Sequence, residues 1–250
     1  MNIPPTAVVL TAAFLSFSAP IYAAGTIDLG QAAGYAVLAG STVTNTGPTS
    51  LFGDVGVSPG TAVTGFPPGT FTGSLHTNDA FSIQAQVDAL SAFNDLAGLS
   101  STQDLTGQDL GGLTLTPGVY HFDTSAQLTG TLTLDGLGQQ NPLFVFQIGS
   151  TLTTASNASI FDINGAGWSN VYFQVGSSAT LGTDTSFEGT IIAQASDTLT
   201  TGATVQGGII ALTGAVTLDS NVVVVPEPGS ALLLTAGVFA LGMRRRRNHC

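Results

Sequence analysis

The chain has 250 residues and a formal net charge of −11, and its only basic side chains are four arginines at residues 244–247. Residues 25–225 therefore carry no Lys or Arg, which excludes binding to nucleic-acid phosphates and attraction to anionic lipid surfaces. The single cysteine, Cys250, also excludes an internal disulfide. Abundant Gly and Thr with few charged residues favours short β-strands and tight turns.

Residues 7–17 are apolar and are followed by the small residues Ala23 and Ala24. This pattern is typical of a secretory signal peptide, although no basic residue precedes the apolar run. We therefore predict a signal peptide over residues 1–24 and a mature domain over residues 25–225. A buried N-terminal helix is the alternative interpretation.

One segment departs from the β-like composition, because residues 74–97 contain neither Gly nor Pro. Apolar residues recur there at helical spacing, and Asn78 and Asp79 are suitable N-caps. The pattern predicts one amphipathic helix, about residues 78–96, with Gly98 as its stop. We expect its apolar stripe to lie on a flat surface. The stripe consists of Ala80, Ile83, Val87, Leu90 and Ala97, widened by Phe93 and Leu96.

After this helix the chain repeats. Similar ten-residue segments start at Gln127, Thr151, Thr180, Thr198 and Thr217 and align Leu128, Leu152, Leu181, Leu199 and Leu218. The last two steps are 18 and 19 residues long, and Ile191 and Ile209 belong to a second column with the 18-residue spacing. Such a period predicts a solenoid of stacked coils with three short strands each and the leucines inside. Residues 38–72 have the same composition and are expected to supply coils out of sequence order.

Short polar residues recur after each leucine. On stacked coils they would form rows spaced about 4.8 Å apart, giving a flat, uncharged and rigid surface that suits a partner with a lattice of its own, such as ice. Thr is also an ordinary residue of exposed strands, so the rows alone favour ice only modestly. The predicted contact residues are Thr133, Thr154, Asn157, Thr183, Ser186, Thr201, Thr204 and Ser220.

Catalysis finds little support in the sequence. The predicted domain has only His76 and His121, no G-x-S-x-G motif and scattered carboxylates. His76, at the helix entry, is expected either to support the helix cap or to face solvent. No Asp-rich loop or metal-ligand spacing occurs, so we expect no enzyme activity, no metal and no cofactor.

The C-terminal residues resemble a known signal. A Pro-Glu-Pro box, an apolar stretch over residues 229–243 and the arginine run together resemble the PEP-CTERM sorting tag of Gram-negative bacteria. The stretch is shorter than a comfortable bilayer span, and the arginines would hold its end in the cytoplasm. The resemblance implies that a membrane protease, an exosortase, removes residues 226–250 and releases or anchors the protein outside the cell; an ordinary membrane anchor is the alternative. The signal residues are Pro226, Glu227, Pro228, Arg244, Arg245, Arg246 and Arg247.

The domain itself resembles the ice-binding proteins of bacteria, fungi and diatoms. Matching segments are residues 35–40, 42–47, 53–60, 65–69, 109–112, 115–120 and 144–149. The resemblance implies a right-handed discontinuous β-solenoid with one long α-helix packed alongside. The family's ice-face pattern, Thr-(Ala/Gly)-any-(Thr/Asn), is matched by residues 154–157 and 201–204, whereas residues 183–186 and 220–223 depart from it.

These observations predict an exported, monomeric, non-enzymatic protein of a Gram-negative bacterium. It would adsorb to ice crystals and inhibit their growth and recrystallisation, meeting an exosortase transiently and a membrane only through its tag. The alternative is an extracellular matrix protein that binds polysaccharide or other cells, for which Trp168 and Tyr172 are the visible aromatic candidates.

Overall fold

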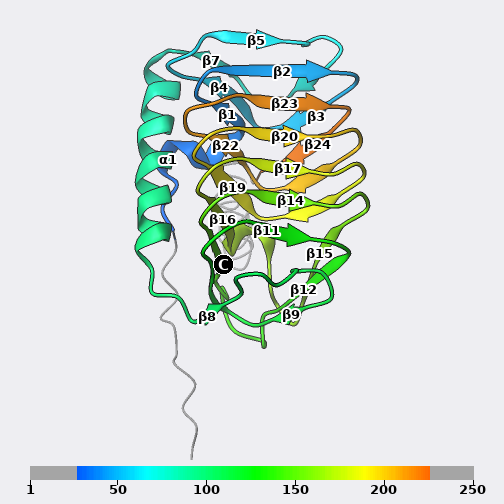
Figure 1. Ribbon diagram of the computed structural model, residues 1–250. Coiled ribbons are helices and arrows are strands. Elements are labelled where there is room, and N and C mark those ends of the chain that lie inside the picture. Colours follow the sequence, from blue (N-terminus) through cyan, green and yellow to red (C-terminus); the bar gives the residue numbers. More distant parts are fainter. Residues whose placement is uncertain (1–26, 226–250) are drawn as a thin grey trace, which may run out of the picture.

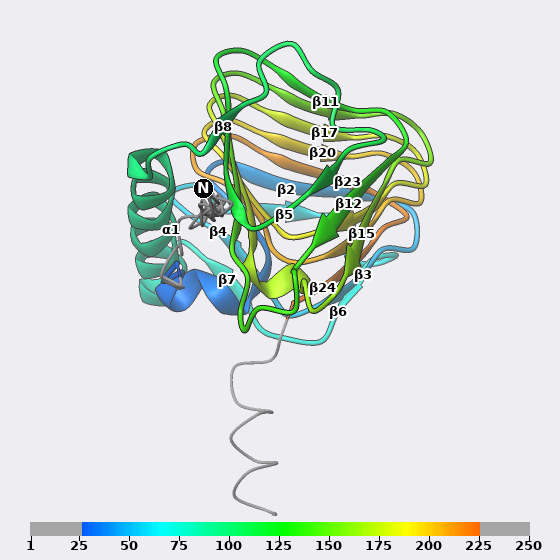
Figure 2. The ribbon, with the colours of Figure 1, turned by 90° about the horizontal axis from the view of Figure 1, so that it is seen from below.

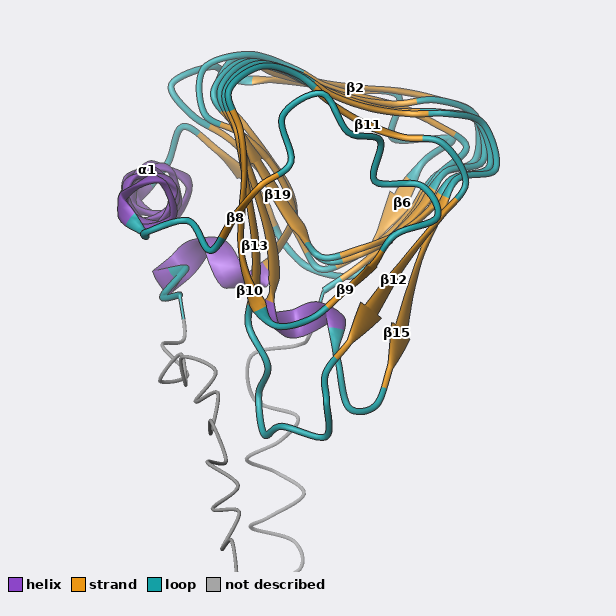
Figure 3. Ribbon diagram, turned by 60° about the horizontal axis from the view of Figure 1, so that its bottom comes forward, coloured by secondary structure: helices purple, strands orange, loops and turns teal. Residues whose placement is uncertain are grey.

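The computed structural model describes residues 27–225. The predicted signal peptide and sorting tag lie outside these residues. Three parallel β-sheets form the sides of a triangular solenoid, and one long helix runs beside the stack (Figures 1 and 3). The predicted mainly β solenoid with a flanking helix is thus confirmed.

Each sheet collects one strand from successive coils, and we name the sheets A, B and C in the order in which a coil visits them. Sheet A contains, from one edge to the other, β7 (Leu75–Thr77), β4 (Asp54–Val57), β1 (Tyr35–Ala39), β22 (Ile209–Ala211), β19 (Thr190–Ala193), β16 (Val171–Val175), β13 (Phe144–Ile148), β10 (Gly118–Phe122) and β8 (Gln103–Asp104). Sheet B contains β11 (Ala126–Leu128), β14 (Leu152–Thr154), β17 (Ala179–Leu181), β20 (Asp197–Leu199), β23 (Val216–Asp219), β2 (Thr42–Thr46) and β5 (Ala62–Thr64). Sheet C contains β6 (Thr70–Phe71), β3 (Ser50–Phe52), β24 (Val222–Val224), β21 (Thr204–Gln206), β18 (Ser186–Glu188), β15 (Ser159–Ile163), β12 (Thr131–Asp135) and β9 (Thr114–Leu115).

The order of strands shows that the solenoid is discontinuous. The chain starts in the middle of the stack with β1 and continues to the end formed by β5, β6 and β7. Helix α1 (Ala80–Gly98) then carries the chain along sheet A to the opposite end, where β8 begins the return (Figure 1). The last coil finally pairs with the first through β22 and β1. The expectation that residues 38–72 supply coils out of order is confirmed.

Aromatic rings and aliphatic side chains fill the interior of the coils. Tyr120, Phe146, Phe173 and Phe187 form a stack with centroid separations of 5.4, 4.4 and 4.7 Å. Aromatic contacts of this kind add about 0.5–1.5 kcal/mol each beyond the burial of apolar area. Because no Lys or Arg occurs in the described residues, this packing and the backbone ladders hold the coils together.

The predicted leucine column is correct except in one coil. Leu128 pairs with Thr154, not with Leu152, and Leu152 pairs with Ala179. The alignment of the Thr151 segment is therefore wrong by two residues. Two long loops, one between β12 and β13 and one between β15 and β16, make the neighbouring coils longer than 18 residues. Matching the similar Thr-Leu pairs divides this extra length wrongly between the two coils, which causes the slip. Since two residues restore the same strand face, the leucine stays inside.

Helix α1 begins two residues later than predicted and ends at Gly98. Its predicted contact stripe is correct only in part: Leu96 is buried against sheet A and Phe93 packs beside it. Ile83, Val87 and Leu90 are about half exposed, at 48, 57 and 47 %. Small residues face sheet A instead, because they let the helix axis approach the flat sheet closely. The buried helix residues are Ser82, Ala85, Ala89, Ala92 and Leu96.

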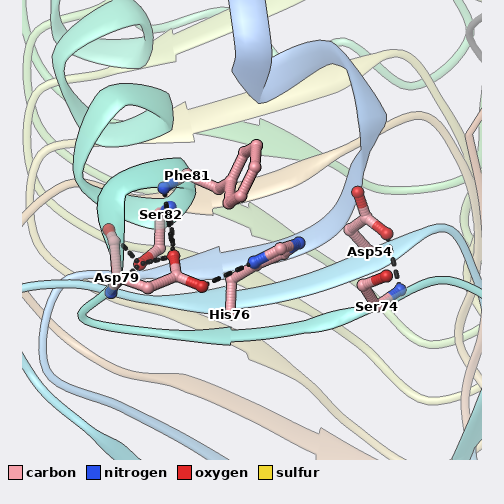
Figure 4. Close-up of polar contacts among 6 residues, drawn as sticks. All are labelled: Asp54, Ser74, His76, Asp79, Phe81 and Ser82. Carbon is pink, nitrogen blue, oxygen red and sulfur yellow. Dashed lines mark hydrogen bonds and ion pairs between the residues drawn. The ribbon is translucent and has the colours of Figure 1, made fainter.

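The start of α1 is fixed by a capping box (Figure 4). Asp79 Oδ1 accepts hydrogen bonds from the N–H groups of Phe81 (3.1 Å) and Ser82 (2.9 Å), while Asp79 N–H donates to Ser82 Oγ. His76 Nδ1 lies 2.8 Å from Asp79 Oδ2 and supports the cap, as the sequence predicts. These hydrogen bonds lower the pKa of Asp79 to about 2. The cap sets where the helix leaves the end coil and starts along sheet A.

Candidate functional site

The outward side of sheet B is a flat surface of small residues, which we call the threonine face. Its central row follows one position through all seven strands, and the ladder pairs are continuous from β11 to β5. Sheet B forms one whole side of the triangle, away from α1 (Figure 2). The central row consists of Gln127, Thr153, Thr180, Thr198, Thr217, Thr44 and Thr64.

The alternation of the strands places this row outside. In β20, Asp197 and Leu199 point into the core and Thr198 between them points out. Strands β14, β17 and β23 have the same buried–open–buried pattern. Parallel strands about 4.8 Å apart therefore bring the six threonines into one line, each with a stiff β-branched side chain.

The threonine hydroxyls of the central row are largely free of the protein. Within residues 27–225, the hydroxyl groups of Thr153, Thr180 and Thr198 make no hydrogen bond to another protein group, whereas Thr44 Oγ1 donates to Thr217 Oγ1 at 3.4 Å. These groups are available to order water. Their methyl groups add an apolar surface at the same spacing.

Two further rows flank the centre. On the side toward sheet A lie Ser125, Thr151, Ser178, Ser196, Ala215, Thr42 and Ala62, where Thr151 Oγ1 donates to Ser125 Oγ at 2.8 Å. On the side toward sheet C lie Thr129, Ala155, Gly182, Thr200, Asp219 and Thr46. Asp219 is the only charged residue of the three rows, and it accepts hydrogen bonds from the hydroxyls of Thr201 and Ser220.

Neither of the other two sides of the solenoid offers such a surface. The outward side of sheet A is covered by α1, which buries Leu38, Ile192 and Ile210. Sheet C exposes Phe52 (45 %) and Phe161 (57 %) next to smaller side chains, so its surface is uneven. The threonine face is the flat, regular and uncovered side.

The residues predicted from the sequence do not share one face. Thr154 is buried (3 % exposed), and its Oγ1 lies 2.8 Å from Thr185 Oγ1 inside the coil, so it cannot touch an external partner. Asn157 and Ser220 have φ values of 59° and 55° and form the turn between sheets B and C. Asn and Ser occupy these positions because short polar side chains tolerate a left-handed backbone in turns.

The remaining predicted residues are exposed or half-buried but divided. Thr183 and Thr201 lie at the corner beside the threonine face, and Thr183 Oγ1 is 3.4 Å from Thr200 Oγ1. Ser186 and Thr204 pair with each other on sheet C. Thr133, also on sheet C, pairs with Phe161. The structure therefore brings only Thr183 and Thr201 next to the regular surface.

Sequence reasoning missed the central row although its signal was present. In the last three copies a Thr comes directly before the aligned leucine: Thr180, Thr198 and Thr217. Because strand side chains alternate, the neighbour of an inward leucine must point outward. The predicted contact residues were taken from the positions after the leucine, and the chain there turns out of sheet B and enters sheet C.

No metal-binding centre is visible in the described part of the chain. Across residues 27–225, no three His, Cys, Asp or Glu side chains gather where they could hold a metal ion. A cleft of about 240 Å³ lies at the vertex between sheets A and C and is lined by Asp28, Trp168, Tyr172 and Val225 among others. It lies on the opposite side of the molecule from the threonine face.

Comparison with known proteins identifies the family. The model of the family described as "Ice-binding-like" matches residues 37–224, almost the whole solenoid. The chain belongs to this ice-binding-like family. A second model, the PEP-CTERM protein-sorting motif, matches residues 224–247 and confirms the C-terminal tag. The sorting motif shows that this family member is an exported protein of a Gram-negative bacterium, extracellular or at the cell surface.

Several relatives and solved structures are similar over most of the chain. An ice-binding protein of Nostoc sp. (strain HG1) is 55 % identical over 243 residues, covering 92 % of this chain and 90 % of its own. The crystal structure of an ice-binding protein from the Antarctic ascomycete Antarctomyces psychrotrophicus has a TM-score of 0.77 at 46 % identity and covers 81 % of this chain and 100 % of its own. One from an Antarctic biological consortium has a TM-score of 0.78 at 45 % identity, covering 90 % and 96 %. In the Antarctomyces protein, a chain that the solenoid matches over its whole length is a folded unit by itself.

Proposed function

We propose that this exported protein binds ice through the threonine face and thereby inhibits ice growth and recrystallisation. The observation that carries the proposal is the central row, in which six threonines occupy equivalent positions of successive coils. Family membership and the names of the relatives support the same function. The matrix-protein alternative gains no support from these relatives.

The geometry accounts for binding to a lattice. Neighbouring rows on a strand are about 6.6 Å apart and neighbouring coils about 4.8 Å apart, so the face presents a two-dimensional array. Ordered water held by the hydroxyls and methyl groups can merge with an ice surface. Because the coils already hold the side chains in place, little conformational entropy is lost on binding.

Adsorption of this kind needs neither a reaction nor a second subunit, so we propose a non-enzymatic protein that acts as a monomer. Its other partner is an exosortase, which would meet the sorting motif during export. The predicted signal peptide at residues 1–24 would direct that export.

The test compares single tyrosine substitutions in purified residues 25–225. Thr198→Tyr places a large ring in the middle of the central row and should abolish most thermal hysteresis and recrystallisation inhibition, because it lifts the face off the ice. Thr201→Tyr, at the corner, should have a smaller effect. Thr204→Tyr, on sheet C, is the matched control and should keep the wild-type activity.

Circular dichroism and thermal unfolding must show that all three variants stay folded. Loss of activity in Thr204→Tyr with retention in Thr198→Tyr would move the site to sheet C, where sequence reasoning placed part of it. A folded wild-type protein without any effect on ice would refute the function itself.

A further inference from the structure

Both ends of the described chain lie at one vertex of the triangle. Each coil passes through sheets A, B and C in turn, so β24 ends where sheet C returns to sheet A. Val225 follows β24, and its N–H donates to the Phe52 carbonyl at 3.1 Å. The first described residues lead through the 3-10 helix η1 (Gly30–Gly34) into β1 of sheet A. Val225 and residues of η1 line the same cleft.

This vertex is the one opposite sheet B. In a triangular coil the corner between two sides faces the third side. Figure 3 shows the arrangement: β2 and β11 of sheet B lie at the top, and the described chain starts and stops at the lower side. An attachment at Val225 therefore leaves the threonine face directed away from the point of attachment.

The sorting motif begins at this point. It matches residues 224–247, so the segment on which the exosortase acts follows the end of β24 directly. The anchor that then holds the protein on the cell is joined within a few residues of Val225, at about 3.3 Å per residue, which limits how far the solenoid can turn. The vertex between sheets A and C is thus kept near the anchor, and sheet B is kept on the outside.

We propose that the protein, retained at the cell surface through its C-terminal end, attaches the cell to ice. This inference rests on the proposed ice-binding function and adds to it the role of the attachment geometry. Many copies on one cell would bind the same crystal together, so even a weak single contact gives firm attachment.

The first test uses the full chain, produced in a Gram-negative host that has an exosortase. Cells that carry the wild-type chain should be retained on an ice surface about a hundredfold more than cells without it, which is the lower end of the gain expected from multivalent binding. Cells producing a chain without residues 226–250 should release active protein into the medium and lose adhesion. Thr198→Tyr should remain on the cells and lose adhesion. Full release of the wild-type protein, or surface retention without adhesion, would overturn the proposal.

The second test examines the geometry with residues 25–225, which lack cysteine. One variant, Ser169→Cys, carries its cysteine on the 3-10 helix η2 (Trp168–Asn170), at the cleft that Val225 also lines. The other variant, Thr153→Cys, carries its cysteine in the central row of the threonine face. Silica particles coupled through residue 169 should collect on ice, and particles coupled through residue 153 should not.

The ice-binding function and the attachment geometry can be tested separately with the same variants. If free, capped Ser169→Cys protein shows no thermal hysteresis, the ice-binding function fails. If that free protein is active but its coupled particles ignore ice, the function stands and the attachment proposal is refuted. Equal binding by both particles would also refute it.

Discussion

Asp197 and Val216 are partners in the parallel ladder between β20 and β23, so a carboxyl and an isopropyl group fill the same inward position of successive coils. Asp197 is 1 % exposed, and neither carboxyl oxygen has a hydrogen-bond partner within the described residues. Burial raises the pKa of Asp197 well above its ordinary value, and the nearby Ala179 N–H opposes the shift only in part. The group is an internal defect in an otherwise apolar column.

Replacing this carboxyl should stabilise the solenoid. Asp197→Val copies the residue of the next coil and should raise the free energy of unfolding at pH 7 by about 1–3 kcal/mol, the usual cost of a buried polar group without a partner. Chemical denaturation with both proteins at pH 7 measures the difference. Thr198→Val, at the adjacent outward position, is the control and should change stability by no more than about 0.5 kcal/mol. Lower stability of Asp197→Val would show that the Asp197 carboxyl forms a stabilising hydrogen bond in the folded protein.

A second carboxyl should shape the pH dependence of stability. Burial raises the pKa of Glu188 from 4.5 to about 7, and the neighbouring Asp162 carboxyl adds to the shift. A group with a raised pKa holds its proton more tightly in the folded state, so its stabilisation is complete below about pH 4.5 and is lost as the pH rises through about 7. Glu188→Gln should therefore flatten the fall in unfolding free energy across this interval, measured by denaturation at a series of pH values.

Asp79→Asn is the control for this experiment, because its pKa is shifted in the opposite direction. The stabilisation by Asp79 is present above its ordinary value of 3.8 and lost as the pH falls through about 2. Asp79→Asn should change the acidic limb of the profile and leave the slope between pH 4.5 and 7 as in the wild type. An unchanged slope in Glu188→Gln would contradict the assignment.

The sequence predicts the class of fold because its signals are local. The 18-residue repeat predicts the stacked coils, and the segment without Gly or Pro predicts the helix. The orientation of side chains needs the register of each coil, and the two-residue slip at Leu152 and the αL turn at Asn157 were enough to misplace the contact surface. For α1, hydrophobicity favoured Ile83 and Val87, whereas the distance allowed between helix and sheet favoured Ala85 and Ala89.

The face of α1 that contacts sheet A leads to a third prediction. Ala89 is fully buried among Leu38, Ile192 and their neighbours, so Ala89→Leu should force α1 away from sheet A and cost about 1–3 kcal/mol. Val87→Ser, on the exposed side of the same helix, should change stability by no more than about 0.5 kcal/mol. Thermal unfolding of both variants distinguishes the observed face from the sequence-predicted one, for which the two effects would be reversed.

The central row can also be extended. Gln127 occupies the position in β11 that threonine takes in the next six strands, and its longer, exposed side chain interrupts the pattern at the end of the row. Gln127→Thr should lengthen the regular array by one coil and raise thermal hysteresis at equal protein concentration. The gain should come without a change in fold, because a β-branched residue suits an exposed strand position.

Gln206→Thr is the control, because it makes the same replacement on sheet C, between Glu188 and Val224, and should leave the activity unaltered. A gain from Gln206→Thr, or a loss from Gln127→Thr in a folded protein, would place the ice contact elsewhere than on sheet B.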